Sequence, residues 1–213
     1  RWIMDTRPFS KGIVTANTSE QLRTKTWAEL AKWHHLGLTK HWWTLNAGGG
    51  GSMNLYNNSH RETWRVDAQT CREENSEAFA GLHAANATPF YIFDEASAVP
   101  DKIWEVREGG LTDGEPMTFD WGNPTRNSGR FFENMEGRFR HRLIRRSIDS
   151  RDVAITNKRL FETWIEDYGI DSDFVKVRVL GQFPSAGELQ FIPGADVTKG
   201  VGLDVAVTPS DAL

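Results

Sequence analysis

The sequence contains little cysteine and no long apolar run. Its single cysteine, Cys71, excludes an internal disulfide bond and any zinc site built from several cysteines, and it favours a reducing compartment. No apolar stretch of the 213 residues approaches the roughly 20 residues that a helix needs to cross a bilayer. We therefore expect Cys71 to be a small packed residue, and we expect no membrane partner.

The chain also lacks an overall positive charge. Its formal net charge is −4, which argues against a uniformly basic nucleic-acid binder. The basic residues are instead concentrated between residues 126 and 159, most densely in the stretch GRFRHRLIRRS. Two interpretations stay open: a patch that contacts DNA phosphates through Arg142, Arg145 and Arg146, or a solvated strand face whose arginines pair with nearby acids.

Strand and helix patterns alternate along the chain. The periodicity and the capping residues predict strands at residues 11–17, 61–70, 89–96, 116–123 and 140–149, and helices at residues 19–37, 100–110, 128–137 and 156–169. This order predicts an α/β fold with three layers, in which a mainly parallel sheet carries helices on both faces. Ligands of such sheets bind at the carboxyl ends of the strands.

Two adjacent acids, Asp94 and Glu95, end the apolar run TPFYIF. Such a run is typical of a buried strand that delivers two carboxylates to the edge of a sheet, where they hold a metal-bound water or activate one, as in a Walker B motif. The alternative is a strand followed by a turn in which Asp94 caps the next helix. Asn123 and Thr125 also fall at the end of a predicted strand.

The stretch AGGGGS at residues 47–52 has the composition of a flexible linker. It lacks the Lys-Ser/Thr pair that a phosphate loop needs, so we interpret it as a flexible loop. Residues 1–6 have the pattern of the last turns of a helix, and the sequence stops just after a new predicted strand at GVGLDVAV. We therefore expect the sequence to be a fragment.

Several stretches together resemble the large subunit of a tailed-phage DNA-packaging terminase. GIVTANTSEQL is similar to the strand and helix that follow the phosphate loop, and FAGLHAANATPFYIFDEASAVPDKIWEV is similar to the Walker B strand and its helix. DWGNPTRNSGRFF resembles the coupling motif, VRVLGQFP the segment that closes the ATPase part, and GLDVA the first strand of the nuclease. Their order and spacing favour the Walker B interpretation of Asp94 and Glu95.

The resemblance implies a P-loop NTPase-like ATPase domain at residues 1–187, truncated before its first strand and phosphate loop. Residues 188–213 would be a linker and the start of an RNase H-like nuclease domain. A protein of this kind couples ATP hydrolysis to the translocation of double-stranded DNA into procapsids and cuts concatemeric DNA. The implied partners are DNA, the terminase small subunit, the portal protein and further copies in a homo-oligomer ring. The implied location is the host cytoplasm.

The resemblance also implies a role for individual residues. Asp94 would hold Mg²⁺ at the β- and γ-phosphates of ATP, and Glu95 would be the general base that orients the attacking water. Asn123 and Thr125 would sense the γ-phosphate. Asp204 would be the first carboxylate of a nuclease site that uses two Mg²⁺ or Mn²⁺ ions.

The sequence departs from the family pattern at the phosphate loop. No G-x-x-x-x-G-K-S/T motif occurs in the 213 residues. We therefore expect these residues alone not to hydrolyse ATP at a motor-like rate. Two alternatives stay open: another helicase-like ATPase, or a remnant that binds DNA or protein without turnover.

Overall fold

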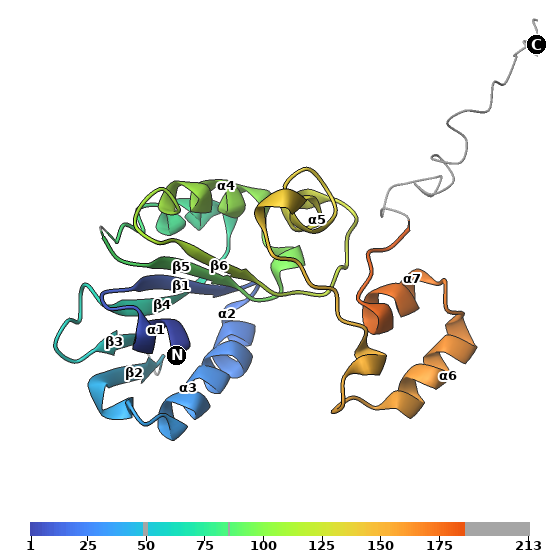
Figure 1. Cartoon of the computed structure of the whole chain (residues 1–213), viewed down its shortest axis with the longest axis horizontal. Coiled ribbons are helices and arrows are strands. Elements are labelled where there is room, and N and C mark those ends of the chain that lie inside the picture. The colour runs from blue at the N-terminus through green and yellow to red at the C-terminus, as the bar shows by residue number, and fades with distance from the viewer. Residues whose placement is uncertain (49–50, 85, 186–213) are drawn as a thin grey trace, which may run out of the picture. The chain divides into compact units, whose positions relative to one another are not determined.

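The computed structural model describes residues 1–48, 51–84 and 86–185 (Figure 1). The chain divides into two compact units. The sheet unit comprises Arg1–Asn123 and Gly129–Phe131, and the helical unit comprises Pro124–Ser128 and, among the described residues, residues 132–185. Within the described residues, no helix is long and apolar enough to span a bilayer.

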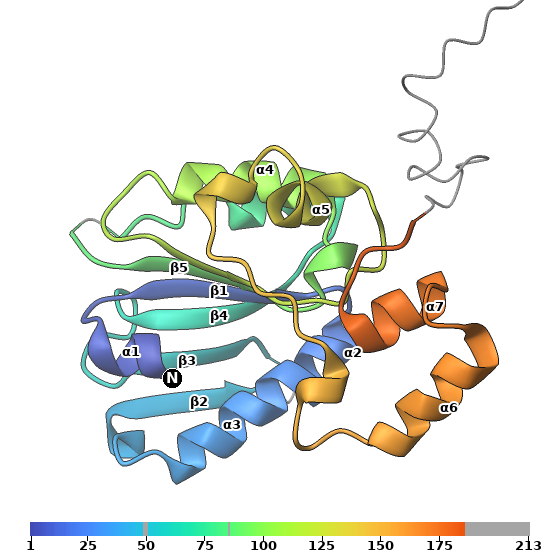
Figure 2. The same ribbon diagram turned by 45° about the vertical axis from the view of Figure 1, so that its right-hand side comes forward.

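The sheet unit is built on a six-stranded sheet with the strand order β2-β3-β4-β1-β5-β6. The strands are β1 (Lys11–Ala16), β2 (Trp43–Ala47), β3 (Met53–Asn57), β4 (Arg65–Thr70), β5 (Pro89–Phe93) and β6 (Met117–Asp120). β1 pairs in parallel with β4 and β5, and β5 pairs in parallel with β6 (Figure 2). β3 is antiparallel to both β2 and β4. The predicted mainly parallel α/β sheet is confirmed.

Helices precede, connect and follow these strands. They are α1 (Trp2–Thr6), α2 (Ser19–Gln21), α3 (Trp27–Leu36), α4 (Asp101–Gly110) and α5 (Gly129–Met135), with a π-helical turn η1 (Leu22–Thr26) between α2 and α3. Short 3₁₀ turns are η2 (Lys40–Trp42), η3 (Glu73–Phe79), η4 (Ala96–Ala98), η5 (Arg140–Arg142) and η6 (Ser150–Asp152). The helical unit adds α6 (Lys158–Tyr168), α7 (Asp173–Val175) and a second π-helical turn η7 (Lys176–Leu180).

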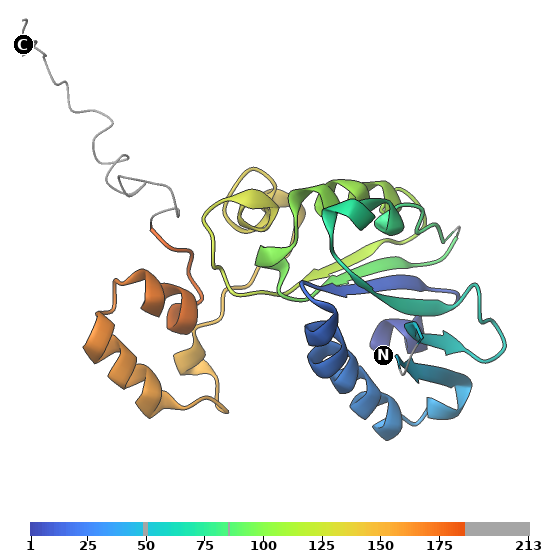
Figure 3. The ribbon, with the colours of Figure 1, turned by 180° about the vertical axis from the view of Figure 1, so that it is seen from behind.

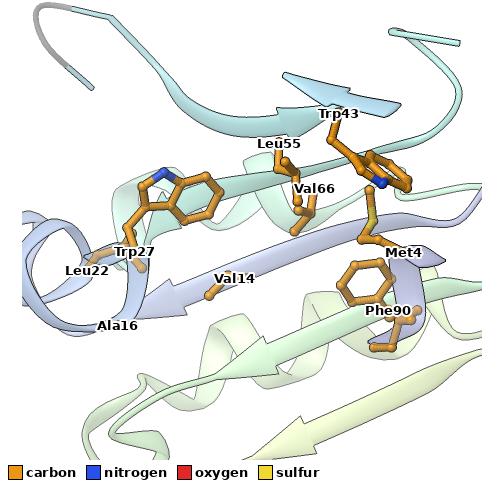
Figure 4. Packing of buried hydrophobic residues seen from close by; sticks show 10 residues of the cluster. Met4, Val14, Ala16, Leu22, Trp27, Trp43, Leu55, Val66 and Phe90 are labelled. Carbon is orange, nitrogen blue, oxygen red and sulfur yellow. The ribbon is translucent and has the colours of Figure 1, made fainter. Parts of the chain in front are cut away.

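One face of the sheet is covered by α1 and α3. The core on this face consists of Ile3, Met4, Val14, Ala16, Leu22, Trp27, Trp43, Leu55, Val66 and Phe90 (Figure 4). The two indoles also satisfy their polar atoms, because Trp27 donates to the Asn46 carbonyl over 2.9 Å and Trp43 donates to Asp5 over 3.1 Å. Burial of these large rings fixes where the two helices lie on the sheet.

The opposite face is covered by α4 and η3, as the views from the front and from behind show (Figures 1 and 3). The Trp104 ring of α4 packs against Phe93 with 4.9 Å between ring centroids. Tyr91 donates to the Phe79 carbonyl over 2.9 Å, and burial raises the pKa of Tyr91 to about 12. β5 is therefore buried on both faces, which explains its continuous apolar sequence and confirms the three predicted layers.

Two features of the sheet unit differ from the sequence expectation. β2 and β3 form an antiparallel hairpin on either side of the glycine-rich stretch, whereas no strand was predicted there. Both strands are short and carry polar residues such as Asn46 and Asn54, whose side chains bond each other over 2.8 Å. This polar content hides the alternation that marks a strand. Residues 49 and 50 of the predicted flexible loop lie outside the described residues.

The helical unit corrects one prediction and confirms another. The predicted strand at residues 140–149 is wrong, because this stretch is the turn η5 followed by irregular backbone. Its central apolar residue, Ile144, is fully exposed, so no sheet face buries the alternating residues. The predicted helix at 156–169 is confirmed as α6, with Asn157 accepting the Leu160 N–H at its start and Gly169 at its end. The expected nuclease segment at 188–213 lies outside the described residues.

Candidate functional site

Asp94 and Glu95 follow β5 directly, at the carboxyl edge of the sheet. The Asp94 N–H donates to the Thr15 carbonyl of β1 over 2.8 Å. On the other side of β5, the Ala96 N–H donates to the Trp121 carbonyl, just after β6, over 2.7 Å. The two acids therefore leave the sheet between the ends of two parallel neighbours, which is where ligands of open α/β sheets bind.

The Asp94 carboxylate is held by two hydrogen bonds. The Thr26 hydroxyl donates to Asp94 Oδ2 over 2.5 Å, and the Glu95 N–H donates to Asp94 Oδ1 over 3.0 Å. Asp94 does not cap the following helices, because η4 has Glu95 and α4 has Pro100 at the N-cap and neither shows a side-chain cap. The capping interpretation of Asp94 is therefore wrong.

Glu95 adopts an unusual backbone conformation. Its φ is 53° and its ψ is 43°, in the left-handed region that a residue with a side chain rarely occupies. Such a conformation costs about 1–3 kcal/mol and clusters at functional sites. Its carboxylate is partly exposed and lies 3.8 Å from the Lys25 ammonium, in a pair open enough to solvent to contribute about 0–1 kcal/mol. Glu95 is thus accessible to a water molecule.

A pocket of about 600 Å³ opens beside the Asp94 carboxylate. Its lining consists of Thr24, Lys25, Thr26, Ala28, Glu29, Ile92, Asp94 and Trp121. The Trp121 side chain is 58% exposed and gives the pocket a flat apolar wall, while η1 supplies hydroxyl and ammonium groups. The predicted helix at 19–37 includes η1, but sequence reasoning missed the contact of η1 with Asp94, because this contact joins residues 68 positions apart.

The donor set fits Mg²⁺ bound together with a nucleotide. Mg²⁺ prefers oxygen ligands and is usually held by one or two carboxylates together with waters and substrate phosphates. Asp94 provides such a carboxylate on the pocket wall. Among the described residues there is no group of three or more His, Cys, Asp or Glu side chains that could hold a metal by themselves. A single carboxylate on the pocket wall fits a metal that substrate phosphates also bind.

Asn123 follows the same edge of the sheet. A Cβ atom added to Gly122 would lie 2.9 Å from the Ala96 nitrogen, so the backbone after β6 contacts the turn that contains Glu95. Asn123, which is exposed, is the next residue in the sequence after Gly122 and therefore lies near that turn. Thr125 belongs to the helical unit, so its predicted role stays a prediction.

A buried ion pair fixes β6 against α4. Arg107 Nη1 lies 2.6 Å from Asp120 Oδ1, and the two side chains are only 2% and 10% exposed. The guanidinium also lies over the rings of Phe93 and Trp104, at 4.8 Å and 4.5 Å from their centroids. Burial raises the pKa of Asp120, an effect that the Arg107 charge opposes. Asp120 precedes Trp121, so this pair anchors one wall of the pocket.

The three candidate DNA-binding arginines are exposed in the helical unit. The Arg142 guanidinium lies 5.6 Å from the Phe139 ring centroid, and Arg145 donates to the Met135 carbonyl. These contacts leave both interpretations of the arginine-rich stretch open, since aromatic stacking and backbone contacts are compatible with a phosphate patch and with a solvated face.

Comparison with known proteins identifies the class of this fold. The structure resembles that of the large terminase from a thermophilic bacteriophage in complex with ADP, with a TM-score of 0.60 and 16% sequence identity over 87% of this chain and 43% of that chain. Another crystal form of the same phage's large terminase gives a TM-score of 0.58 with the same identity and coverage. The six-stranded α/β sheet thus shares its fold with part of a large terminase.

The sequence points to the same class. In an alignment of 145 residues that covers 62% of this chain, it is 30% identical to the probable terminase large subunit of Enterobacteria phage P7. A homologue of the chain is thus a phage terminase large subunit. The chain spans 28% of the length of that relative. No family model matches the sequence.

Proposed function

We propose that this chain is the ATPase part of a phage terminase large subunit, a motor that couples ATP hydrolysis to the translocation of double-stranded DNA into procapsids. One observation carries the proposal: Asp94, which follows β5 directly and precedes Glu95, lines a pocket at the carboxyl edge of the sheet, in a fold shared with an ADP-bound large terminase. In this proposal the ATPase domain comprises residues 1–187, and residues 188–213 begin the nuclease domain.

Asp94 and Glu95 divide the chemistry between them. Asp94 holds Mg²⁺ beside the nucleotide, because its carboxylate lines the pocket and is fixed through both oxygens. Bound Mg²⁺ supplies positive charge to the phosphates. Glu95 orients and deprotonates the attacking water, because its carboxylate is partly exposed and only weakly paired with Lys25. Asn123 and Thr125 sense the γ-phosphate.

A phosphate loop would have a defined place in this sheet. Among the described residues, β6 pairs with β5 alone, so its outer edge is open to a further strand. A strand that pairs with this edge in parallel would end beside Trp121 and Asn123. A phosphate loop at the end of such a strand would face the pocket that Asp94 lines.

The remaining roles extend the proposal to the whole protein. Arg142, Arg145 and Arg146 contact DNA phosphates, and Asp204 is a ligand of the nuclease metals, Mg²⁺ or Mn²⁺. The protein acts in the host cytoplasm with the terminase small subunit, the portal protein and further copies of itself in a ring. A second candidate function is binding of DNA or protein without turnover by these 213 residues, favoured by the lack of a G-x-x-x-x-G-K-S/T motif among them.

Calorimetric titration of ADP into the full-length protein, with Mg²⁺ and with EDTA, tests the nucleotide site. We expect Mg²⁺ to strengthen ADP binding in the wild type and Asp94→Asn to abolish this gain while the affinity in EDTA stays unchanged. Glu29→Gln is the matched control, because Glu29 lines the same pocket but pairs with Lys32 at 3.1 Å. A wild type that does not bind ADP, or an Asp94→Asn variant that keeps the Mg²⁺ effect, would contradict the proposal.

A further inference from the structure

The Thr26 hydroxyl makes a short hydrogen bond to the site. Its Oγ1 lies 2.5 Å from Asp94 Oδ2, in the range of charge-assisted bonds between a hydroxyl and a carboxylate. Such bonds are about twice as strong as those between neutral groups. The second carboxylate oxygen accepts the Glu95 N–H, so the plane of the carboxylate is fixed from both sides.

The π-helical turn η1 explains how Thr26 reaches Asp94. The helical segment is fixed at its start by Thr18, whose hydroxyl accepts the Gln21 N–H over 3.1 Å. It is fixed again at buried Trp27, whose ring lies in the core and bonds the Asn46 carbonyl. Between these points the Trp27 N–H donates to the Leu22 carbonyl, five residues back, so the turn holds one residue more than an α-helical turn. Such π turns frequently occur at functional sites.

A neighbouring threonine shows that the Thr26 contact is specific. A helical threonine hydroxyl commonly donates to the carbonyl four residues earlier. Thr24 does this, with 2.7 Å between its Oγ1 and the Glu20 carbonyl. Thr26, two residues later in the same turn, donates instead to a carboxylate 68 residues away in sequence.

We propose that Thr26 is a positioning residue for the metal-binding carboxylate of Asp94. The inference rests on the proposed function of Asp94. The carboxylate torsion of an aspartate is broad and weakly restrained by itself. The Thr26 hydroxyl removes this freedom while each carboxylate oxygen keeps lone pairs for a metal. Groups that orient a metal ligand by a hydrogen bond, without binding the metal themselves, typically contribute about 10- to 100-fold to metal affinity.

The test is a Mn²⁺ titration of the full-length protein saturated with ADP, in which free Mn²⁺ is measured by electron paramagnetic resonance. Thr26→Val removes the hydroxyl and keeps the branched shape, and we expect it to weaken Mn²⁺ binding by about 10- to 100-fold. Thr26→Ser keeps the hydroxyl and should restore an affinity close to that of the wild type. Thr6→Val is the control for the same change at a helical threonine outside the pocket, because the Thr6 hydroxyl donates to the Trp2 carbonyl over 2.8 Å, and its Mn²⁺ affinity should equal that of the wild type.

ADP affinity in EDTA and thermal unfolding distinguish positioning from a structural role. Thr26→Val should leave both unchanged, because the hydroxyl acts through Asp94 alone. A Thr26→Val variant that keeps wild-type Mn²⁺ affinity, or one that unfolds or loses ADP binding in EDTA, would overturn the inference. A wild type that binds ADP without taking up Mn²⁺ would overturn it as well. A wild type that binds no ADP would contradict the proposed function itself.

Discussion

Removal of Arg107 should destabilise the sheet unit strongly at neutral pH. The Asp120 carboxylate that pairs with this guanidinium is 10% exposed, so it cannot recruit enough water when its partner is lost. Breaking a buried ion pair by removal of one partner costs about 3–5 kcal/mol. Loss of the contacts between the cation and the Phe93 and Trp104 rings adds about 0.5–2 kcal/mol. The total is a large fraction of the roughly 5–15 kcal/mol that stabilises a typical domain.

The choice of substitution isolates the charge from the packing. Arg107→Met keeps an unbranched apolar chain between the two rings, so its effect should come mainly from the unpaired Asp120. The double variant Arg107→Met with Asp120→Asn removes both charges and should regain most of the lost stability, because neutral replacements of buried ion pairs are often well tolerated. Lys102→Met is the control, since its pair with Glu105 is exposed and contributes about 0–1 kcal/mol.

The cost of Arg107→Met should depend on pH. Burial already raises the pKa of Asp120 in the wild type, and loss of the opposing Arg107 charge raises this pKa further. A raised folded-state pKa contributes stability below the unfolded value of 3.8, and that stability is lost as the pH rises through the folded-state pKa. The difference in unfolding free energy between wild type and Arg107→Met should therefore be largest at neutral pH and shrink toward about pH 4.

Urea unfolding followed by tryptophan fluorescence measures these differences. Eight of the nine tryptophans lie in the sheet unit and Trp164 lies in the helical unit, so the signal reports mainly on the sheet unit. A loss below about 1 kcal/mol in Arg107→Met, the range of an exposed pair, would refute the reasoning. So would a loss that grows as the pH falls, because it would mean that charged Asp120 is not what destabilises the variant.

Three further predictions concern packing, DNA and turnover. Gly12→Ala should lower the free energy of unfolding by about 1–3 kcal/mol in thermal or urea unfolding, because the new Cβ would lie 2.1 Å from the Phe90 ring. An unchanged stability would mean that the ring moves freely. Replacement of Arg142, Arg145 and Arg146 with alanine should reduce the slope of log affinity for duplex DNA against log salt by about 2.7, if each arginine neutralises one phosphate. The control is Arg151→Ala, because the Arg151 guanidinium pairs with Asp149. A slope in the triple variant equal to that of the wild type would favour the solvated face. The 213-residue chain by itself should show no motor-like ATP turnover in a phosphate-release assay. Positioning of the γ-phosphate supplies most of the catalysis, and the 213 residues lack the phosphate-loop motif that would position it. Turnover of about one per second would reveal a phosphate-binding loop among these residues.

The centre of the sheet could be predicted from the sequence because its signals are local. The apolar run before Asp94 marks a strand buried on both faces, and separate strand patterns predicted β1 and β6, which pair with β5 in parallel in the structure. Asp94 and Glu95 directly follow that strand in the sequence, so their position at the carboxyl edge of the sheet follows from the sequence alone.

The rest of the site depends on contacts that no local pattern encodes. Thr26 reaches Asp94 only because of a π turn set by a cap and a buried ring, and Arg107 finds Asp120 only when α4 packs on the sheet. The strand predicted for the arginine-rich stretch at 140–149 was wrong, because alternating apolar residues form a strand only where one face of the sheet is buried. Ile144, the central apolar residue of this stretch, is fully exposed. Sequence patterns therefore predicted the acids but not the groups that hold them.

ATP turnover by the full-length protein carrying Glu95→Gln tests the central claim most directly. The substitution keeps the shape of the side chain and removes the base, so we expect turnover to fall by about 10²- to 10⁴-fold while Mg²⁺-dependent nucleotide binding is retained. Glu29→Gln, on the wall of the same pocket, should turn over ATP like the wild type. A Glu95→Gln variant with wild-type turnover would contradict the assignment of Glu95 as the base.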